Sequence, residues 1–215
     1  MFGVFYESYR VVIVAFILAL LFDFLDGFAA RMLDQSSSVG QELDSLADLI
    51  SFGVFPTFLF IDIVERSIEI SEWPVYGLIF LLAAGAALRL ATFNTDENEI
   101  IGFSGLPSPA MAMIAFAVWI NLDNSVYPSL EMLADPTFIL ILALGLTIVM
   151  NLPLKFIKFS IGTTFELNQV LSLILILIFI GGLFVSWRLS VLITSISYFI
   201  LSLLLPLFTN TMQRT

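Results

Sequence analysis

Two residue types are missing from the 215-residue chain: cysteine and histidine. Without cysteine the chain can form no disulfide and has no thiolate nucleophile. Without histidine it lacks the side chain that most often transfers protons near neutral pH. A zinc site of histidine and cysteine and a serine–histidine–aspartate triad are therefore both excluded. Any chemistry must come from carboxylates, lysine, arginine, hydroxyl groups or amides.

Charged residues are scarce, at 12% of the chain against 60% hydrophobic residues. A soluble domain has roughly 25% charged residues, so this chain has too few to cover a water-soluble globule. The composition is typical of a protein with several membrane spans, in contact with membrane lipid. The net charge of −10 argues against nucleic-acid binding, because a phosphate backbone requires a basic surface.

Seven apolar runs divide the sequence, and each is near the roughly 20 residues that a membrane-spanning helix needs. They are residues 11–25, 43–64, 74–93, 107–122, 136–150, 167–187 and 189–208. Lipid offers no partner to backbone polar groups, so these runs are expected to be helices. The sequence predicts an all-α, polytopic transmembrane bundle of about seven spans. No linker or repeat interrupts it, so residues 1–215 are expected to form a single membrane domain.

The basic residues predict which side of the membrane each loop faces. If the loop 26–41 is cytoplasmic, five basic residues lie at or near the inner face and three lie outside. This bias follows the positive-inside rule. The acidic segment 65–72 then lies outside. We expect a multi-pass protein of the cell membrane whose 26–41 loop faces the cytoplasm.

Four aspartates lie where the first two apolar runs meet the loop between them. Asp23 and Asp26 are three residues apart, and Asp44 and Asp48 are four apart, so each pair shares one helix face. Two antiparallel helices can aim all four carboxylates at one point, where cations would offset their repulsion. Oxygen ligands favour Mg²⁺ or Mn²⁺, with Ca²⁺ as an alternative at one site, and two ions would balance four charges. The alternative is a solvated acidic loop beside a membrane helix.

Glycine and arginine complete this pattern. Gly27 and Gly40 leave room for a ligand to approach closely, and Arg31 has the planar fork that suits phosphate. The whole pattern consists of Asp23, Asp26, Gly27, Ala30, Arg31, Gly40, Asp44 and Asp48. It matches the signature of the CDP-alcohol phosphotransferases at every position, and the chain resembles that family.

The resemblance implies a homodimer of helical membrane subunits with a divalent-metal site formed by the four aspartates. It also implies that Asp48 is the general base. The residues that would line the cytidine diphosphate site are Asp23, Asp26, Gly27, Ala30, Arg31 and Gly40. Compared with the family pattern, the usual first helix is largely missing here, since Met1 lies only 22 residues before Asp23.

The flanking sequence narrows the resemblance to the phosphatidylserine synthase branch. Residues 40–54, 89–94 and 105–109 are similar to that branch, and Ser45 stands where the glycerol-phosphate branch would have a proline. The resemblance implies transfer of a phosphatidyl or archaetidyl group from a CDP-activated lipid to the hydroxyl of L-serine, with release of CMP.

Two alternative functions remain open. An inositol-phosphate or glycerol-phosphate acceptor would need its own basic pocket, and few basic residues are left to form one. A cation transporter is a more remote alternative, because these carboxylates lie at helix ends and not at the membrane midplane.

Arg89 and Asn94, near the end of the third apolar run, are candidates for binding serine. A guanidinium can pair with the serine carboxylate. The alternative for Arg89 is an anchoring role, in which the side chain extends to the membrane interface.

The second apolar run contains a predicted kink. Pro56 lacks a backbone N–H and clashes with the preceding turn, and Gly53 loosens the same turn. A kink beside the aspartates would leave a groove for a lipid chain, lined by Phe52, Gly53 and Phe55. The alternative is close helix packing at Gly53, which membrane helices often use.

Overall fold

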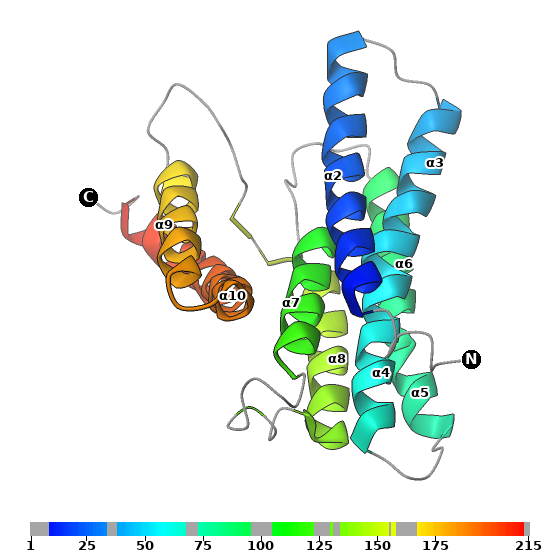
Figure 1. Cartoon of the computed structure of the whole chain (residues 1–215). Coiled ribbons are helices and arrows are strands. Elements are labelled where there is room, and N and C mark those ends of the chain that lie inside the picture. The colour runs from blue at the N-terminus through cyan, green and yellow to red at the C-terminus, as the bar shows by residue number, and fades with distance from the viewer. Residues whose placement is uncertain are drawn as a thin grey trace.

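The computed structural model describes residues 9–33, 38–67, 73–95, 105–122, 130, 134–154, 156–157 and 167–212. Within these ranges every regular element is a helix (Figure 1). In chain order they are α2 (Tyr9–Leu33), α3 (Ser38–Leu49), the π-helical segment η1 (Ile50–Val54), α4 (Phe55–Ser67), α5 (Trp73–Ile79), α6 (Leu81–Thr95), α7 (Ser108–Asn121), α8 (Pro136–Asn151), α9 (Leu167–Leu183) and α10 (Trp187–Met212).

Each predicted apolar run contains helix. Among the described residues, four helical stretches are long and apolar enough to cross a membrane: Tyr9–Phe28, Glu42–Arg66, Pro74–Thr95 and Trp187–Leu204. The other three runs correspond to the shorter apolar helices Ser108–Asn121, Pro136–Asn151 and Asn168–Leu183. The predicted all-α membrane bundle is therefore confirmed.

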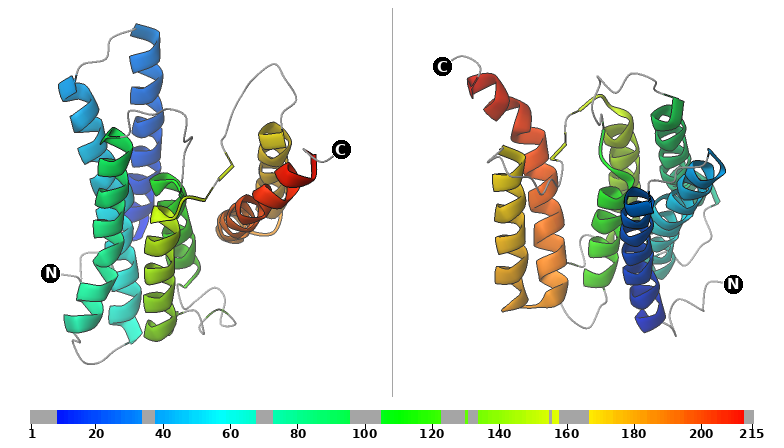
Figure 2. Two further views of the ribbon diagram at one scale, coloured as in Figure 1. Left: turned by 180° about the vertical axis from the view of Figure 1, so that it is seen from behind. Right: turned by 90° about the horizontal axis from the view of Figure 1, so that it is seen from above.

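The helices form a main bundle with a helical pair at its side. In the main bundle α4 packs on α7 and α8, and α6 packs on α8 and η1. Helix α2 joins this bundle through Phe16, whose ring stacks on Phe116 at 4.3 Å and on Phe55 at 5.7 Å between ring centroids. Helices α9 and α10 pack on each other, and α10 connects the pair to the rest by packing on α7 (Figure 2).

A buried acidic residue joins α4 to α7. The Asp62 side chain is 6% exposed, accepts a hydrogen bond of 2.7 Å from Nε1 of Trp119, and forms an ion pair with Arg66. Tyr9 of α2 stacks on the Trp119 ring at 4.9 Å. Because the protein itself supplies its partners, the buried Asp62 is satisfied and links α4 to α7, while Tyr9 packs α2 against the same Trp119 ring.

Proline and aspartate mark the start of α8. Pro136 occupies the first turn, where a missing N–H costs nothing. The Asp135 side chain caps the helix by accepting bonds from the backbone N–H groups of Phe138 and Thr137. These bonds lower the pKa of Asp135 below its ordinary value, because they favour the charged carboxylate.

The irregularity predicted near Gly53 and Pro56 is present as the π-helical segment η1. The backbone N–H of Phe55 donates to the carbonyl of Ile50, five residues back. The Thr57 hydroxyl donates to the Gly53 carbonyl at 2.8 Å. Pro56 has no N–H to give to the helical ladder, so a wider turn just before it leaves fewer backbone groups in conflict.

The lipid groove predicted along η1 is not found at that position. Phe52 is fully buried, so it cannot line an open groove. A Cβ atom built on Gly53 would lie 2.9 Å from Cβ of Ala86 in α6. The ring of Phe55 stacks on Phe16. Close packing at Gly53, the alternative considered with the groove, is what the structure contains.

Replacing Gly53 with alanine should therefore destabilise the protein. The new Cβ would meet both Ala86 and Leu49, and overpacking of this kind costs about 1–3 kcal/mol. Gly145→Ala in α8 is the matched control, because no atom lies within 4 Å of its added Cβ. We expect thermal unfolding in detergent to show a lower Tm for Gly53→Ala and an unchanged or higher Tm for Gly145→Ala. Equal stability of the two variants would refute the tight contact.

Candidate active site

The four aspartates come from two neighbouring helices. Asp23 and Asp26 lie on α2, and Asp44 and Asp48 lie on α3. The carboxyl groups of Asp23 and Asp48 are within hydrogen-bonding reach of each other, and Asp48 also interacts electrostatically with Asp44 and Asp26. Asp23 and Asp48 are half-buried, whereas Asp26 and Asp44 are exposed. The structure thus brings all four carboxylates into one region at the α2–α3 end of the bundle.

The chemistry of this group fits divalent cations. All four side chains offer the carboxylate oxygens that Mg²⁺, Mn²⁺ and Ca²⁺ prefer. The contact between Asp23 and Asp48 joins two acidic groups, which a cation bound between them would stabilise. In the part of the chain that the structure describes, no three acidic side chains are gathered closely enough to form a complete metal site. The donor set is therefore present, but a compact cage is not.

A cavity of about 580 Å³ opens beside Asp44 and Asp48. The remaining residues that line it come from α3, α6 and the start of α7: Glu42, Ser45, Arg89, Leu90, Phe93, Asn94, Pro107, Ser108 and Pro109. The cavity is hereafter called the carboxylate pocket. Its walls combine acidic groups, one guanidinium and several small polar groups, so it suits a ligand that carries both charges.

Both residues predicted to bind serine line the carboxylate pocket. Arg89 donates a hydrogen bond from Nη1 to Oγ of Ser108 at 2.9 Å, and it interacts electrostatically with Asp48. Its Nε is buried without a hydrogen-bond partner among the described residues. Asn94 donates from Nδ2 to Oγ of Ser45 at 2.9 Å. The guanidinium of Arg89 is thus held against Ser108 inside the bundle, at the wall of the carboxylate pocket.

The wall of the pocket at α7 depends on a glycine. Gly105 has a φ of +89°, and a Cβ built on it would lie 2.0 Å from the carbonyl oxygen of Met150. Its N–H donates to the carbonyl of Leu154 at 2.8 Å, and the N–H of Leu106 donates to the carbonyl of Val149 at 3.4 Å. These hydrogen bonds hold the residues before α7 against the C-terminal end of α8. They fix the place of Pro107, Ser108 and Pro109.

The expected cytidine diphosphate residues are described unequally. Gly27 lies on α2 with no atom within 4 Å of an added Cβ, so space is available beside it. Gly40 lies in the first turn of α3 and is exposed. Ala30 and Arg31 lie further along α2, and their side chains fall outside what the structure describes.

Sequence reasoning missed several residues of the carboxylate pocket. The similarity of residues 105–109 to the phosphatidylserine synthase branch gave Ser108 no role, yet Ser108 holds Arg89. In the sequence, Ser45 is distinguished only by standing where the glycerol-phosphate branch would have a proline. The structure shows that its hydroxyl accepts a hydrogen bond from Asn94. The signal available in the sequence was the recurrence of small polar residues near the charged ones, and this pattern does not specify which residues pair.

The sequence model of the CDP-alcohol phosphatidyltransferase family matches residues 1–180. The chain belongs to this family. Its members generally depend on a divalent metal, in agreement with the four aspartates.

Several curated relatives carry the name CDP-diacylglycerol–serine O-phosphatidyltransferase. The chain is 38% identical to the one from Bacillus subtilis over 96 residues, which cover 44% of this chain and 51% of the relative. It is 40% identical to that of Methanocaldococcus jannaschii over 113 residues, 51% of this chain and 52% of the relative. It is 34% identical to that of Helicobacter pylori over 158 residues, 71% of this chain and 65% of the relative.

The matched part of the chain thus spans about half the length of the first two relatives. No solved structure matches the chain significantly.

Removing one negative charge should stabilise the metal-free protein. In Asp48→Asn the amide can still bond to Asp23, but the repulsion is lost. In EDTA we expect a higher Tm than for the wild type, by about 2–4 °C for each kcal/mol gained. Added Mn²⁺ should stabilise the wild type by about 2.7 kcal/mol at 100 times the Kd, and the variant by less.

Glu42→Gln is the control for this experiment. Glu42 lies exposed on the same helix and lines the same pocket. Its neutralisation should leave both the Tm in EDTA and the response to Mn²⁺ close to those of the wild type. A Tm below that of the wild type for Asp48→Asn in EDTA would contradict the repulsion.

Proposed function

We propose that this protein transfers the phosphatidyl group, or its archaeal archaetidyl counterpart, from a CDP-activated lipid to the hydroxyl of L-serine, releasing CMP. The names of the aligned relatives support this donor and this acceptor. The observation that carries the proposal is that Arg89 and Asp48 share one pocket. Serine needs a cation for its carboxylate close to a base for its hydroxyl, and this pair offers both.

The reaction would proceed by one displacement at phosphorus. Asp48 accepts the proton of the serine hydroxyl while the serine oxygen forms a bond to the phosphorus on the lipid side of the diphosphate. The bond from that phosphorus to the bridging oxygen breaks, and CMP leaves with the electron pair. Divalent ions, when bound, would polarise the diphosphate and offset the charge on CMP.

The proposed ligand sets follow from the two helices that meet at the site. Asp23, Asp26, Asp44 and Asp48 would hold two ions, Mg²⁺ or Mn²⁺, with Ca²⁺ as an alternative at one position. The cytidine diphosphate group would contact Asp23, Asp26, Gly27, Ala30, Arg31 and Gly40. The open space beside Gly27 supports such an approach.

Serine would bind between α6 and the start of α7. Arg89 lines the pocket, and its guanidinium supports pairing with the serine carboxylate. Asn94 can accept from the serine ammonium through its amide oxygen, while its Nδ2 stays bonded to Ser45. Among the described residues that line the pocket, Arg89 is the only cation, which makes a phosphorylated acceptor a less favourable fit.

We further propose that the site faces the cytoplasm and that the protein is a homodimer. The positive-inside distribution of basic residues supports the first point. The resemblance to the family supports the second.

Purified protein in lipid vesicles should release CMP from CDP-diacylglycerol only when serine and a divalent metal are both present. Inositol phosphate and glycerol phosphate should not replace serine. Asp48→Asn should lower the rate about 10²–10⁴-fold, the usual contribution of a general base, while CDP-lipid still binds. Metal-dependent turnover with glycerol phosphate but not with serine would overturn the assignment of the acceptor.

Arg89→Lys should weaken serine binding selectively. Lysine keeps the positive charge but loses the fork, and a hydrogen bond to a charged group contributes ~1.5–3 kcal/mol. We expect the KM for serine to rise about tenfold or more, with the KM for CDP-lipid unchanged. Arg10→Lys, at an exposed position on α2, should alter neither constant. A normal serine KM in Arg89→Lys would instead favour the anchoring role of Arg89.

A further inference from the structure

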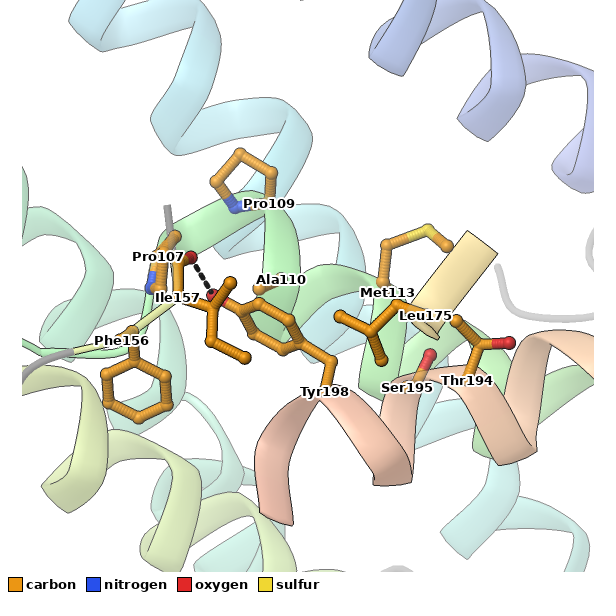
Figure 3. Close-up of a pocket in the computed structure, with 10 residues that line it drawn as sticks. All are labelled: Pro107, Pro109, Ala110, Met113, Phe156, Ile157, Leu175, Thr194, Ser195 and Tyr198. Atoms are coloured by element: carbon orange, nitrogen blue, oxygen red, sulfur yellow. Dashed lines mark hydrogen bonds between the residues drawn. The ribbon is translucent and has the colours of Figure 1, made fainter. Parts of the chain in front are cut away.

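A second cavity, of about 450 Å³, lies between α7 and the α9–α10 pair (Figure 3). Apolar groups dominate its lining, and its polar side chains are three hydroxyl-bearing residues of α10. The lining residues are Pro107, Pro109, Ala110, Met113, Phe156, Ile157, Leu175, Thr194, Ser195 and Tyr198. This cavity is hereafter called the apolar pocket. None of the described residues that line it carries a charge, so the described walls suit an apolar group better than serine or a nucleotide.

The apolar pocket adjoins the carboxylate pocket. Pro107 and Pro109 line both cavities, so the first turn of α7 forms their common wall. Tyr198, which lines the apolar pocket, lies near Arg89, which lines the carboxylate pocket. One molecule can therefore place a charged group in the carboxylate pocket and an apolar part in the apolar pocket.

The apolar pocket also extends in the direction that a lipid chain requires. From Pro107 to Met113 it follows α7 for six residues, about 9 Å at the helical rise per residue. Its α10 wall, from Thr194 to Tyr198, lies within the stretch Trp187–Leu204, which is long and apolar enough to cross a membrane. The cavity thus begins at the wall that it shares with the carboxylate pocket and continues along α7 and α10.

The position of the Tyr198 ring is fixed by its hydroxyl. That hydroxyl donates to the carbonyl of Ile157 at 3.4 Å, as the dashed line in Figure 3 marks. The N–H of Ile157 in turn donates to Oγ of Ser202 at 3.3 Å. These contacts bind the segment 156–157 to α10. The backbone N–H and carbonyl of Ile157 are therefore satisfied, and its side chain and that of Phe156 line the cavity with apolar atoms.

We propose that the apolar pocket holds a hydrocarbon chain of the CDP-activated lipid while its diphosphate lies at the aspartates. This inference rests on the proposed function, since it assigns a further part of the same substrate. It also relocates the lipid site, because the residues first expected to form it, around Gly53, are closed by helix packing. The chain would displace water from apolar surface, and binding would strengthen with the length buried.

The test compares binding of two donors, dioleoyl and dihexanoyl CDP-diacylglycerol, in Mn²⁺ and without serine. Leu175 on α9 lines the apolar pocket and is 2% exposed, whereas Leu177, two residues on, is 68% exposed. Leu175→Trp should fill the cavity, and Leu177→Trp is the matched control facing outward. Ala110→Phe fills the cavity from α7 and serves if Leu175→Trp does not fold.

The wild type and Leu177→Trp should bind the dioleoyl donor more tightly than the dihexanoyl donor. The cavity-filling variants should lose about tenfold in affinity for the dioleoyl donor and little for the dihexanoyl donor. All folded variants should bind water-soluble CDP equally. An unchanged preference for the long chain in both filling variants would overturn the proposal, as would an equal loss in Leu177→Trp. Because serine is absent, an error in the acceptor would leave this result unaffected.

Discussion

The arrangement of the site depends on one close contact between helices, where Gly53 of η1 meets Ala86 of α6. These helices run antiparallel, so the contact sets the register along their whole length. Ser45 precedes Gly53 by eight residues and Asn94 follows Ala86 by eight, and the two side chains are hydrogen-bonded. Within the same register Asp48 faces the pocket that Arg89 enters. The close approach that Gly53 permits therefore determines which residues of the two helices face each other about two helical turns away, where Ser45 and Asn94 are hydrogen-bonded.

Two acidic environments in the bundle contrast in how their charge is balanced. Asp62 is buried between helices, and Trp119 and Arg66 supply its partners. The carboxyl group of Asp48 has another acidic group, Asp23, within hydrogen-bonding reach. A carboxylate that has protein partners stabilises the packing of the helices. Clustered carboxylates repel one another and destabilise the fold until a bound cation offsets their charge. This difference separates a structural acid from a group suited to hold cations and substrate.

Much of this arrangement could be predicted from spacing within single helices. The apolar runs specified the helices, and the intervals between the aspartates placed each pair on one face. The combination of Gly53 and Pro56 located the irregular turn. The lipid groove was misplaced because the exposure of Phe52 depends on helices that pack against it from elsewhere in the chain. The apolar pocket could not be predicted either, because it combines residues from 107 to 198 whose proximity is a tertiary property.

The left-handed turn at Gly105 bears on the order in which the protein is assembled. A growing chain emerges from its N-terminus, and helices can pack as soon as they are made. The pairs of aspartates and Arg89 are all present once α6 has been synthesised. The wall that carries Ser108, however, is seated by bonds to Val149 and Leu154. Although its charged groups are translated early, the carboxylate pocket acquires its final shape only after α8 has been inserted.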